Sequence, residues 1–374
     1  MKVRVMAAAE LTQDLRDAWT RIQRKRVELS SPYFTPGFVE AAALCRDGVR
    51  IGVLEDGGRP MGFFPFELRP FGVAQPVGGR MSDFQGVIAE PGCDWRADEL
   101  VAGCGLRMWK FDHLLTDQTE FAGFVEATRG SPALDLRAGF DGYHAGRKAD
   151  GSKHIDRLLY KARRMRRQLG EVHFEFDSRD APVLEQVIEW KRAQCRRTGV
   201  VDFLAERRNV NLLRTIFEIR TEGFAGILSV LRVGDRIASA HFGMRTHDTL
   251  HYWFPAYERA LSRHSPGEIL LTEMIRAAAE SGFVHLDLGK GDDHYKDQFC
   301  THVIPVAEGA VAVSRPVAVL RRVHKLAMDF LRHSTIAAPV RAMRRLQHHL
   351  RKSRLEPESL AESPEGTLDE HARS

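Results

Sequence analysis

Apolar positions that recur every three or four residues after Ser265 predict an amphipathic helix that ends at Gly282. Ser265, Pro266 and Glu268 stand in the order of an N-cap, a first helical residue and a capping-box partner. A short apolar strand is expected directly after the helix, over 283–288. A turn, helix and strand in this order would place unpaired backbone N–H groups at a cleft, which suits the binding of a phosphate.

The pattern of apolar positions predicts an ordered series of elements over 171–313. Alternating apolar residues indicate strands, and apolar residues at helical spacing indicate helices. The pair Gly234 and Asp235 is typical of the turn of a β-hairpin. In chain order we expect a strand over 171–178, helices over 181–197 and 206–222, hairpin strands over 227–233 and 236–245, a strand over 249–257, the helix and strand described above, a short helix near Tyr295 and a strand over 303–313.

Residues 1–140 repeat this order of elements, which predicts a duplicated fold. The hairpin sequence VLEDGGRPMGFFPF at 53–66 aligns without a gap to VLRVGDRIASAHFG at 230–243, a constant offset of 177 (230 − 53). Chance similarity between two hairpins is the alternative, because few positions are identical. The first series comprises an opening strand, helices within 12–29 and 36–44, a hairpin over 50–69, a strand over 84–89, a helix over 95–106 and a strand over 108–115.

The length and composition indicate a globular protein. At 374 residues the chain is long enough for two domains. It contains no apolar run of the roughly 18 residues that a membrane span needs, and its first residues lack the apolar core of a secretory signal, so we expect a cytoplasmic protein. The five cysteines are widely spaced and the sixteen histidines form no H-E-x-x-H motif, so neither a disulfide framework nor a metal site is expected.

The net charge of +5 is unevenly distributed along the chain. Lysine and arginine concentrate in 153–167 and 321–354, and an acidic segment closes the chain over 355–374. Each basic stretch is either a solvated helix face or a surface that attracts an anionic cofactor, substrate or lipid. Nucleic acid is a poorer candidate, because the interleaved aromatic residues of a single-strand binder are missing from these stretches.

Five stretches carry a resemblance to a known family: WKRAQCRRTGV (190–200), SAHFGMR (239–245), HYWFPAY (251–257), SPGEILL (265–271) and LDLGKGDDHYKDQF (286–299). The order of elements resembles the GNAT acyltransferase fold. Over about residues 30–312 the chain resembles more closely the CelD/BcsL family of acetyltransferases, which are linked to cellulose and exopolysaccharide production. Its paired arrangement is also similar to the FemAB-type aminoacyltransferases, in which two GNAT-like modules flank one cleft.

This resemblance implies an α/β (α+β) protein with tandem GNAT-like modules, each a mixed, mostly antiparallel sheet flanked by helices. We expect a degenerate N-terminal module over 1–145 and the acetyltransferase module over 146–313. A basic helical extension over 314–354 and a disordered acidic tail over 355–374 would follow. The tail has almost no large apolar residue and cannot pack a core.

The resemblance also implies acyl-CoA as co-substrate, with its pyrophosphate bound at the turn before the predicted helix. Arg263, Ser265 and Gly267 are therefore the candidate cofactor-binding residues. The glycine-rich pattern of the GNAT fold is present only in part, because Pro266 has no N–H and Glu268 would repel a phosphate. A capped helix that binds no ligand is the alternative.

Three residues are candidates for catalysis. Tyr295 stands near the place where GNAT enzymes often have a tyrosine that protonates the thiolate, and otherwise it anchors the loop. His241 lies within an apolar strand, as either a general base or a hydrogen-bonded core residue. Asp287 lies between two leucines and would serve as a base or as a partner that orients a histidine or lysine.

The loop that follows the strand over 283–288 is rich in charged residues. Such side chains usually face solvent, but at the carboxyl end of a strand they could bind a polar acceptor. The candidate substrate-binding residues are Lys290, Asp292 and Lys296.

The expected function is N- or O-acyl transfer from acyl-CoA, with acetyl-CoA as the first choice of donor. The acceptor implied by the resemblance is a saccharide or cell-envelope precursor in cellulose or exopolysaccharide biosynthesis. One alternative is FemAB-like transfer from aminoacyl-tRNA. Another is a catalytically degenerate scaffold of a polysaccharide synthase, which the basic extension would bring to the synthase or to the inner membrane.

Overall fold

The computed structural model describes residues 1–291 and 294–313. The predicted extension over 314–354, the predicted tail over 355–374 and the candidate residue Asp292 lie outside the described residues.

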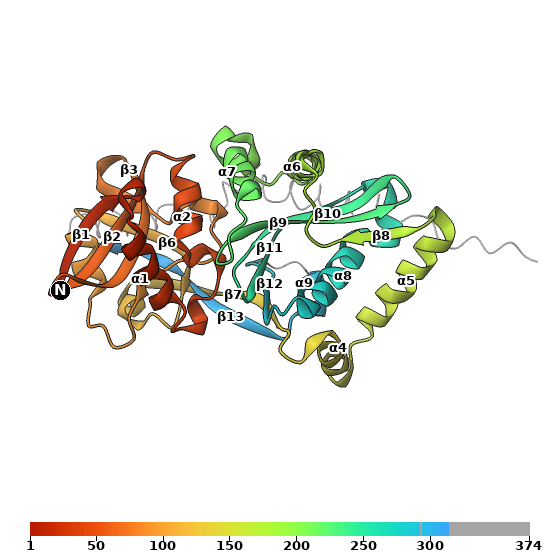
Figure 1. Ribbon diagram of the computed structural model, residues 1–374, viewed down its shortest axis with the longest axis horizontal. Coiled ribbons are helices and arrows are strands. Elements are labelled where there is room, and N and C mark those ends of the chain that lie inside the picture. The colour runs from red at the N-terminus through yellow and green to blue at the C-terminus, as the bar shows by residue number, and fades with distance from the viewer. Residues whose placement is uncertain (292–293, 314–374) are drawn as a thin grey trace, which may run out of the picture. The chain divides into compact units, whose positions relative to one another are not determined.

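The described strands form one 13-stranded sheet, with the order β1-β2-β3-β4-β6-β13-β7-β12-β11-β10-β9-β8 and with β5 paired to β3 beside this path (Figure 1). The strands are β1 (Lys2–Ala7), β2 (Val49–Asp56), β3 (Arg59–Arg69), β4 (Val73–Gln75), β5 (Ile88–Ala89), β6 (Met108–Leu115), β7 (Val125–Asp135), β8 (Val172–Glu175), β9 (Ala225–Val233), β10 (Arg236–Arg245), β11 (Thr249–Tyr257), β12 (His285–Asp287) and β13 (His302–Ala312).

The two halves of the chain repeat with a period of 177 residues. In the first hairpin Val53 pairs with Phe63, and in the second Val230 pairs with Ala240, so both positions shift by 177 (230 − 53 and 240 − 63). The irregularity in the ladder near the turn also repeats at this offset. The gap-free alignment of the two hairpins is thereby confirmed. The same offset relates the bounds of β7 to those of β13 (302 − 125 and 312 − 135).

Each half of the sheet is completed by a strand from the other half of the chain. In the first half Met108 of β6 pairs with Ala312 of β13, and in the second half His285 of β12 pairs with Asp135 of β7. Strands β7 and β13 then pair with each other, antiparallel, at the centre of the sheet. Strands from before and after residue 145, the expected module boundary, therefore belong to one continuous sheet. The position of that boundary stays a prediction.

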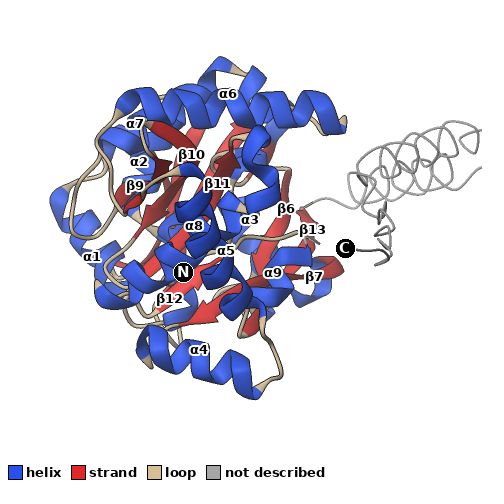
Figure 2. Ribbon diagram, turned by 90° about the vertical axis from the view of Figure 1, so that its right-hand side faces the viewer, coloured by secondary structure: helices blue, strands red, loops and turns tan. Residues whose placement is uncertain are grey.

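Helices cover both faces of the second half of the sheet. Helices α6 and α7 pack on one face, and α4, α5 and α8 pack on the other (Figures 1 and 2). The long helices predicted in this half are present. The ends of α6 and α8 lie close to the predicted ones, whereas α7 ends at Glu218, four residues before the predicted end at 222. The helices are α1 (Gln13–Gln23), α2 (Pro36–Ala43), α3 (Ala97–Gly103), α4 (Gly139–Ala149), α5 (His154–Leu169), α6 (Ala181–Thr198), α7 (Arg207–Glu218), α8 (Pro266–Glu280) and α9 (His294–Phe299).

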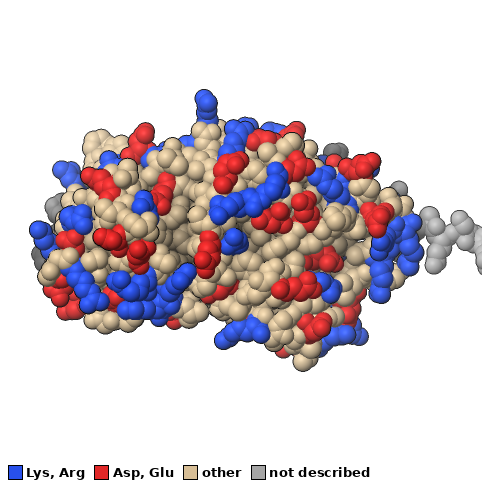
Figure 3. All heavy atoms as spheres, viewed as in Figure 1, with Lys and Arg blue, Asp and Glu red and all other residues tan. Residues whose placement is uncertain are grey.

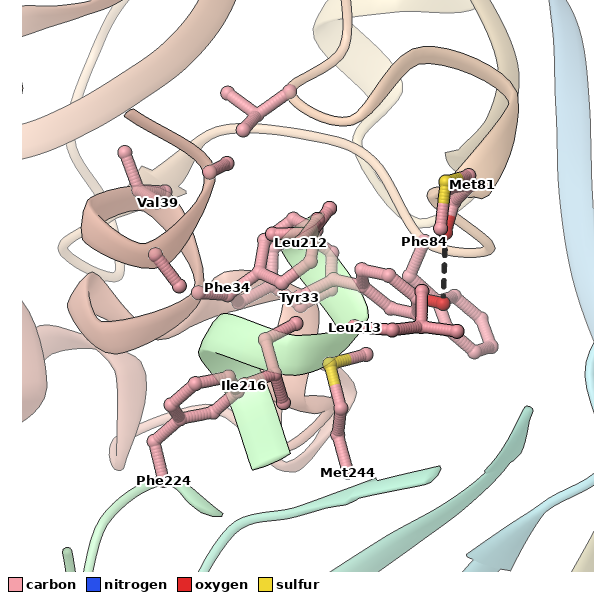
Figure 4. Close-up of a cluster of buried hydrophobic side chains, with 14 of the residues drawn as sticks. Tyr33, Phe34, Val39, Met81, Phe84, Leu212, Leu213, Ile216, Phe224 and Met244 are labelled. Carbon is pink, nitrogen blue, oxygen red and sulfur yellow. Dashed lines mark hydrogen bonds between the residues drawn. The ribbon is translucent and has the colours of Figure 1, made fainter. Parts of the chain in front are cut away.

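A shared hydrophobic core joins the two halves. Phe34 and Val39 of the first half belong to the same buried cluster as Leu212 and Ile216 of α7 (Figure 4). All four side chains are almost completely shielded from solvent. Burial of these apolar side chains stabilises the contact between the two halves.

A buried ion pair lies at the same junction. Arg46 and Glu67 come from the first half, and each side chain is only 3% exposed, with Nη1 and Oε2 3.2 Å apart. The other terminal nitrogen of Arg46 donates to Asn209 Oδ1 on α7. Burial lowers the pKa of Arg46, whereas Glu67 opposes this effect.

Replacing Arg46 by Met should lower the free energy of unfolding by about 3 kcal/mol or more, because Glu67 would remain buried without its main partner. Urea denaturation followed by circular dichroism measures the change. The matched control is Arg214→Met, which breaks a pair with Glu185 in which both side chains are about half exposed. We expect a loss of about 1 kcal/mol or less there. Equal effects of the two substitutions would contradict the structural role of Arg46.

Candidate active site

The candidate site lies where strands β11 and β12 separate. These parallel strands pair at only three positions, and His251 opposite Asp287 is the last of them. Strand β11 continues to Tyr257, whereas β12 ends at Asp287. The two side chains point to the same face of the sheet, with His251 Nδ1 2.5 Å from Asp287 Oδ2.

Residues of the first half complete this cluster. His251 Nε2 lies 3.2 Å from Asp83 Oδ2 and 3.1 Å from the hydroxyl of Tyr33. Ser131 on β7 donates from its hydroxyl to Asp287 Oδ1 at 3.2 Å, and the backbone N–H of Gly289 donates to the same oxygen at 3.0 Å. The site therefore exists only when the two halves are together.

Gly289 is a position at which a side chain would disturb the site. Its φ of +70° is in the left-handed region, and a Cβ atom there would lie 2.8 Å from Asp83 Oδ2. A larger residue would displace the carboxylate of Asp83 from His251.

The electrostatics of the cluster keep His251 charged. Burial opposes the imidazolium, but the carboxylates of Asp287 and Asp83 outweigh it and raise the pKa of His251 to about 9. Burial, followed by the charges of Asp83 and Asp287, raises the pKa of Tyr33 well above its ordinary value. Tyr33 thus stays protonated, and its hydroxyl donates to the carbonyl oxygen of Met81 at 3.0 Å (Figure 4).

His241 lies on the other face of the sheet, among the residues that pack towards α8. Its Nε2 accepts the backbone N–H of Trp253 at 3.1 Å, and its ring stacks on Tyr252 with the centroids 4.4 Å apart. The accepted N–H lies at an irregularity in the β10–β11 ladder, between the pairs of Phe242 and Met244. Burial lowers the pKa of His241 well below its ordinary value, so the ring is neutral. Its predicted role as a base stays a prediction.

Helix α8 begins as predicted, with Ser265 at the N-cap position and Pro266 as its first residue, but the capping hydrogen bonds differ from the prediction. Ser265 has a left-handed backbone (φ 53°, ψ 49°) and does not cap the helix through its side chain, so the predicted capping box is wrong. A 3-10 helix, η8 (Arg259–His264), runs directly into Ser265 and fixes this geometry. The hydroxyl of Ser265 instead accepts from Lys161 Nζ on α5 at 2.8 Å. Glu268 lies 2.8 Å from His154 Nε2, also on α5.

Cations from two elements surround this helix start. Arg263 donates from Nε to His264 Nε2 at 3.0 Å. Burial lowers the pKa of His264, and the nearby charges of Arg263 and Arg164 lower it further. Gly267 meets only Tyr257, at an ordinary contact distance of 3.4 Å, so packing alone does not require glycine there. The candidate cofactor-binding residues Arg263, Ser265 and Gly267 are therefore adjacent to a positively charged surface of α5.

Tyr295 lies on α9, half-buried against the core of the second half. Burial raises the pKa of Tyr252, and the proximity of Tyr295 and Glu268 raises it further. Tyr295 is thus close to Tyr252, which also lies near Glu268 of α8. It shares the α8 side of the sheet with His241, whereas Asp287 faces the other side.

The two described loop lysines bind protein groups. Lys290 Nζ lies 2.7 Å from Glu308 Oε1 and donates to the carbonyl oxygen of Asp112 at 2.8 Å. Lys296 is buried and donates to the carbonyl oxygen of Gly289 at 3.0 Å. These bonds hold the loop after β12, and the predicted contact of either lysine with an acceptor stays a prediction.

A pocket of about 270 Å³ opens beside Asp287, between residues of both halves. Its walls are largely apolar, and Asp287 lines it together with Ser31 and Thr249. A second groove of about 560 Å³ adjoins it, since Val27 and Ser30 line both. Asp287, a buried carboxylate bonded to His251, is thus part of the wall of a pocket that has the size of a small-molecule site.

Raising the pH should destabilise the protein through His251. Its pKa is 6.5 ordinarily and about 9 here, so the stabilisation is complete below pH 6.5 and is lost as the pH rises through 9. We expect the free energy of unfolding to fall by about 3 kcal/mol between these values. Urea denaturation at pH 6.5 and 9.5 measures it.

A His251→Gln variant should lack this pH-dependent loss, while the control His294→Asn should keep it because that side chain is 89% exposed. A loss of the same size in His251→Gln would contradict the assignment.

The comparisons with known proteins agree with this architecture. Residues 152–297 match the family model described as an acetyltransferase (GNAT) domain. A search of curated proteins found no match. Among the described residues no helix is long and apolar enough to cross a membrane, and no group of three or more His, Cys, Asp or Glu residues is arranged to hold a metal ion.

Three solved structures resemble the fold. The C-terminal domain of a protein described as a lysylphosphatidylglycerol synthetase from Agrobacterium fabrum is 14% identical, with a TM-score of 0.52, and the match covers 82% of this chain and 94% of that one. FemX is 11% identical, with a TM-score of 0.55 and coverage of 85% and 99%. A protein of unknown function from Bacteroides thetaiotaomicron is 10% identical, with a TM-score of 0.54 and coverage of 83% and 100%.

These structural likenesses concern the fold alone. Together with the repeat of 177 residues, they confirm the predicted tandem GNAT-like α/β fold. The match of residues 152–297 to the acetyltransferase (GNAT) domain supports an acyltransferase of the GNAT type.

Proposed function

We propose that this chain transfers an acyl group from acyl-CoA, with acetyl-CoA as the first choice, to an amino or hydroxyl group of a small acceptor. The observation that carries the proposal is the buried pair of His251 and Asp287 at the end of β12, beside a pocket of about 270 Å³. GNAT domains generally use acyl-CoA, and residues 152–297 match such a domain.

Asp287 is the proposed base on the acceptor side. It reaches the pocket, while three groups of the protein hold its carboxylate in place. His251 is a positioning residue, since it is completely buried and bonded to carboxylates on both sides. A carboxylate held in this way can take a proton from an acceptor without reorganising.

The donor is proposed to lie on the α8 side of β11. Arg263, Ser265 and Gly267 would face its phosphates, with Lys161 of α5 adding positive charge. Tyr295 is the proposed acid for the departing thiolate. The acyl group would reach Asp287 through the point where β11 and β12 separate.

The biological setting rests on the resemblance to the CelD/BcsL family. We propose a saccharide or cell-envelope precursor as acceptor, in cellulose or exopolysaccharide biosynthesis, and a cytoplasmic location that is peripheral to the inner membrane. Contact with a membrane or a polysaccharide synthase would come from 314–354, which lies outside the described residues.

Calorimetric titration of the full chain with acetyl-CoA tests the donor. We expect binding, and a loss of about tenfold in affinity for Lys161→Met, because a cation bonded to a phosphate contributes about 1.5 kcal/mol or more. The control Lys148→Met removes a half-exposed lysine paired with Asp156 and should bind normally. Asp287→Asn should also bind acetyl-CoA normally, because Asp287 is on the acceptor side. No heat from a folded protein at millimolar acetyl-CoA would exclude this donor.

A second donor, aminoacyl-tRNA, is favoured by the position of α5. This helix covers the start of α8 through the contacts Lys161–Ser265 and His154–Glu268, where a coenzyme would bind. Its outer face is exposed and basic (Figure 3). The exposed arginines on it are Arg157, Arg163, Arg164, Arg166 and Arg167.

Charged tRNA should then bind with an affinity that falls steeply between about 50 and about 200 mM salt. An Arg163→Gln/Arg167→Gln variant should reduce the slope, since each contact with a phosphate contributes about one unit to it. Filter binding measures the affinity. An unchanged slope in the variant, or no binding at low salt, would exclude this donor.

A further inference from the structure

The turn between β3 and β4 presents an aromatic side chain to solvent, far from any described role in the candidate site. Phe71 stands at the tip of this turn, between Pro70 and Gly72, and its side chain is 87% exposed. The turn is short and closed, because Arg69 pairs with Val73 across its base. A single exposed apolar residue is common on protein surfaces, so further observations must decide whether this one has a function.

The backbone of Phe71 is strained. Its φ of 65° and ψ of 25° are left-handed, and Ser265 is the only other residue besides glycine with a positive φ in the described part of the chain. The Cβ atom makes this conformation unfavourable for a bulky residue, whereas glycine and asparagine adopt it readily. A smaller residue would therefore fold more easily at this tip. Strained residues of this kind cluster at functional positions.

Exposed apolar side chains lie on both sides of the turn. Leu68 on β3, next to Arg69, is 41% exposed, and Val313 is 40% exposed. The backbone of Arg107 links Val313 to the turn, since its carbonyl oxygen accepts the N–H of Val313 at 3.1 Å and its own N–H donates to the carbonyl oxygen of Gly72 at 2.8 Å. Phe71 is thus the most exposed member of a small apolar patch.

Two arginines flank this patch. Arg107 is exposed, and its side chain passes beside the turn, because a Cβ atom on Gly72 would lie 3.2 Å from Arg107 Cγ. Arg69 directly precedes the turn, with its side chain 32% exposed. Both cations are therefore close to the backbone that carries Phe71.

The acidic residues nearby leave a positive charge at the turn. Arg69 pairs with Glu67, with Nη2 and Oε1 3.3 Å apart, but Glu67 also pairs with the buried Arg46. One carboxylate thus faces two guanidinium groups. Asp47 is exposed near Leu68 and opposes Arg107. Arg46, Arg69 and Arg107 together exceed Glu67 and Asp47 by one charge.

An exposed aromatic tip between cations suits the boundary of an anionic bilayer. Aromatic rings are favoured between the headgroups and the acyl chains, and arginines near the surface are attracted to anionic lipid. Val313 is also the last residue described, so the basic stretch over 321–354 follows in the sequence from the side of this turn.

We propose that Phe71 inserts into the headgroup region of an anionic membrane, while Arg69 and Arg107 contact the lipid phosphates. This adds a surface of the described chain to the membrane contact proposed for 314–354. The inference rests on the peripheral location given under the proposed function, and it is independent of acyl transfer.

Flotation of the full chain with vesicles of equimolar phosphatidylglycerol and phosphatidylcholine tests the contact. Phe71→Asn should weaken partition into the vesicles about tenfold, because the ring no longer leaves water. Asparagine tolerates the left-handed backbone, so this variant should unfold at the temperature of the parent or above it. Arg107→Gln should weaken partition about fivefold. A Phe71→Asn variant that floats like the parent would overturn the proposal.

Tyr160→Gln is the matched control, because Tyr160 is a 55% exposed aromatic residue on the basic helix α5. This variant should float like the parent, and a loss as large as that of Phe71→Asn would place the contact on α5 and overturn the proposal. Vesicles of phosphatidylcholine alone should bind the parent more weakly than the anionic vesicles, and equal binding would contradict the role of the arginines.

Two other occupants of the patch give different results with Phe71→Asn. A lower unfolding temperature would mean that residues of the same chain cover the ring. A change from dimer to monomer in sedimentation velocity would mean that a second copy covers it. Either result would overturn the proposal. No acyl donor or acceptor is present in these experiments, so their outcome is separate from that of the acetyl-CoA titration.

Discussion

The antiparallel pairing of β7 with β13 is the interaction on which the rest of the structure depends. Each of these strands ends one half of the chain and completes the sheet of the other half. In either half alone, the backbone N–H and C=O groups along one side of β6 or of β12 would lack hydrogen-bond partners in the protein. The exchange also places Ser131 and Ala133 of β7 next to Asp287. The candidate site is therefore a product of the duplication rather than of one module.

Buried charge gives the junction between the halves its specificity. His251 and Asp287 are removed from water, whereas the side chain of Asp83 is 22% exposed, and the desolvation of the buried pair is offset when all three meet. Arg46, Glu67 and Asn209 form a second polar contact of the same kind. The apolar cluster around Phe34 and Ile216 supplies the general attraction between the halves. The polar groups fix one relative position, and that position brings Tyr33 and Ser31 to the site.

Local patterns along the sequence predicted most helices and strands of the second half, but they did not predict the arrangement of the site. The strands over 236–245 and 249–257 have the predicted ends, because alternation and turn residues act over short distances. Strand β7 escaped prediction because its first part is exposed and polar, and Gly130 and Pro132 are poor strand formers. His251 was missed because its partner Tyr33 is 218 residues away along the chain. A signal existed, since a strand, a helix and a strand in succession, as over 249–288, commonly form neighbouring parallel strands, which would bring His251 close to Asp287.

The proposed donor residues and the proposed acceptor residues lie on opposite faces of β11. His241, Tyr252 and Tyr295 lie towards α8, where the cations of α5 and η8 gather, and His251 faces the opposite way, towards the side of Asp287 and its pocket. A flat, fully paired strand would keep these two sides apart. The early end of β12 and the irregularity near Gly243 interrupt the pairing of β11 at the position where a thioester would have to cross. Because His241 holds the N–H of Trp253 at this irregularity, the ring fixes the backbone on the proposed donor side just as Asp287 is fixed on the proposed acceptor side. The rigidity of both sides is what would hold donor and acceptor in one reactive geometry.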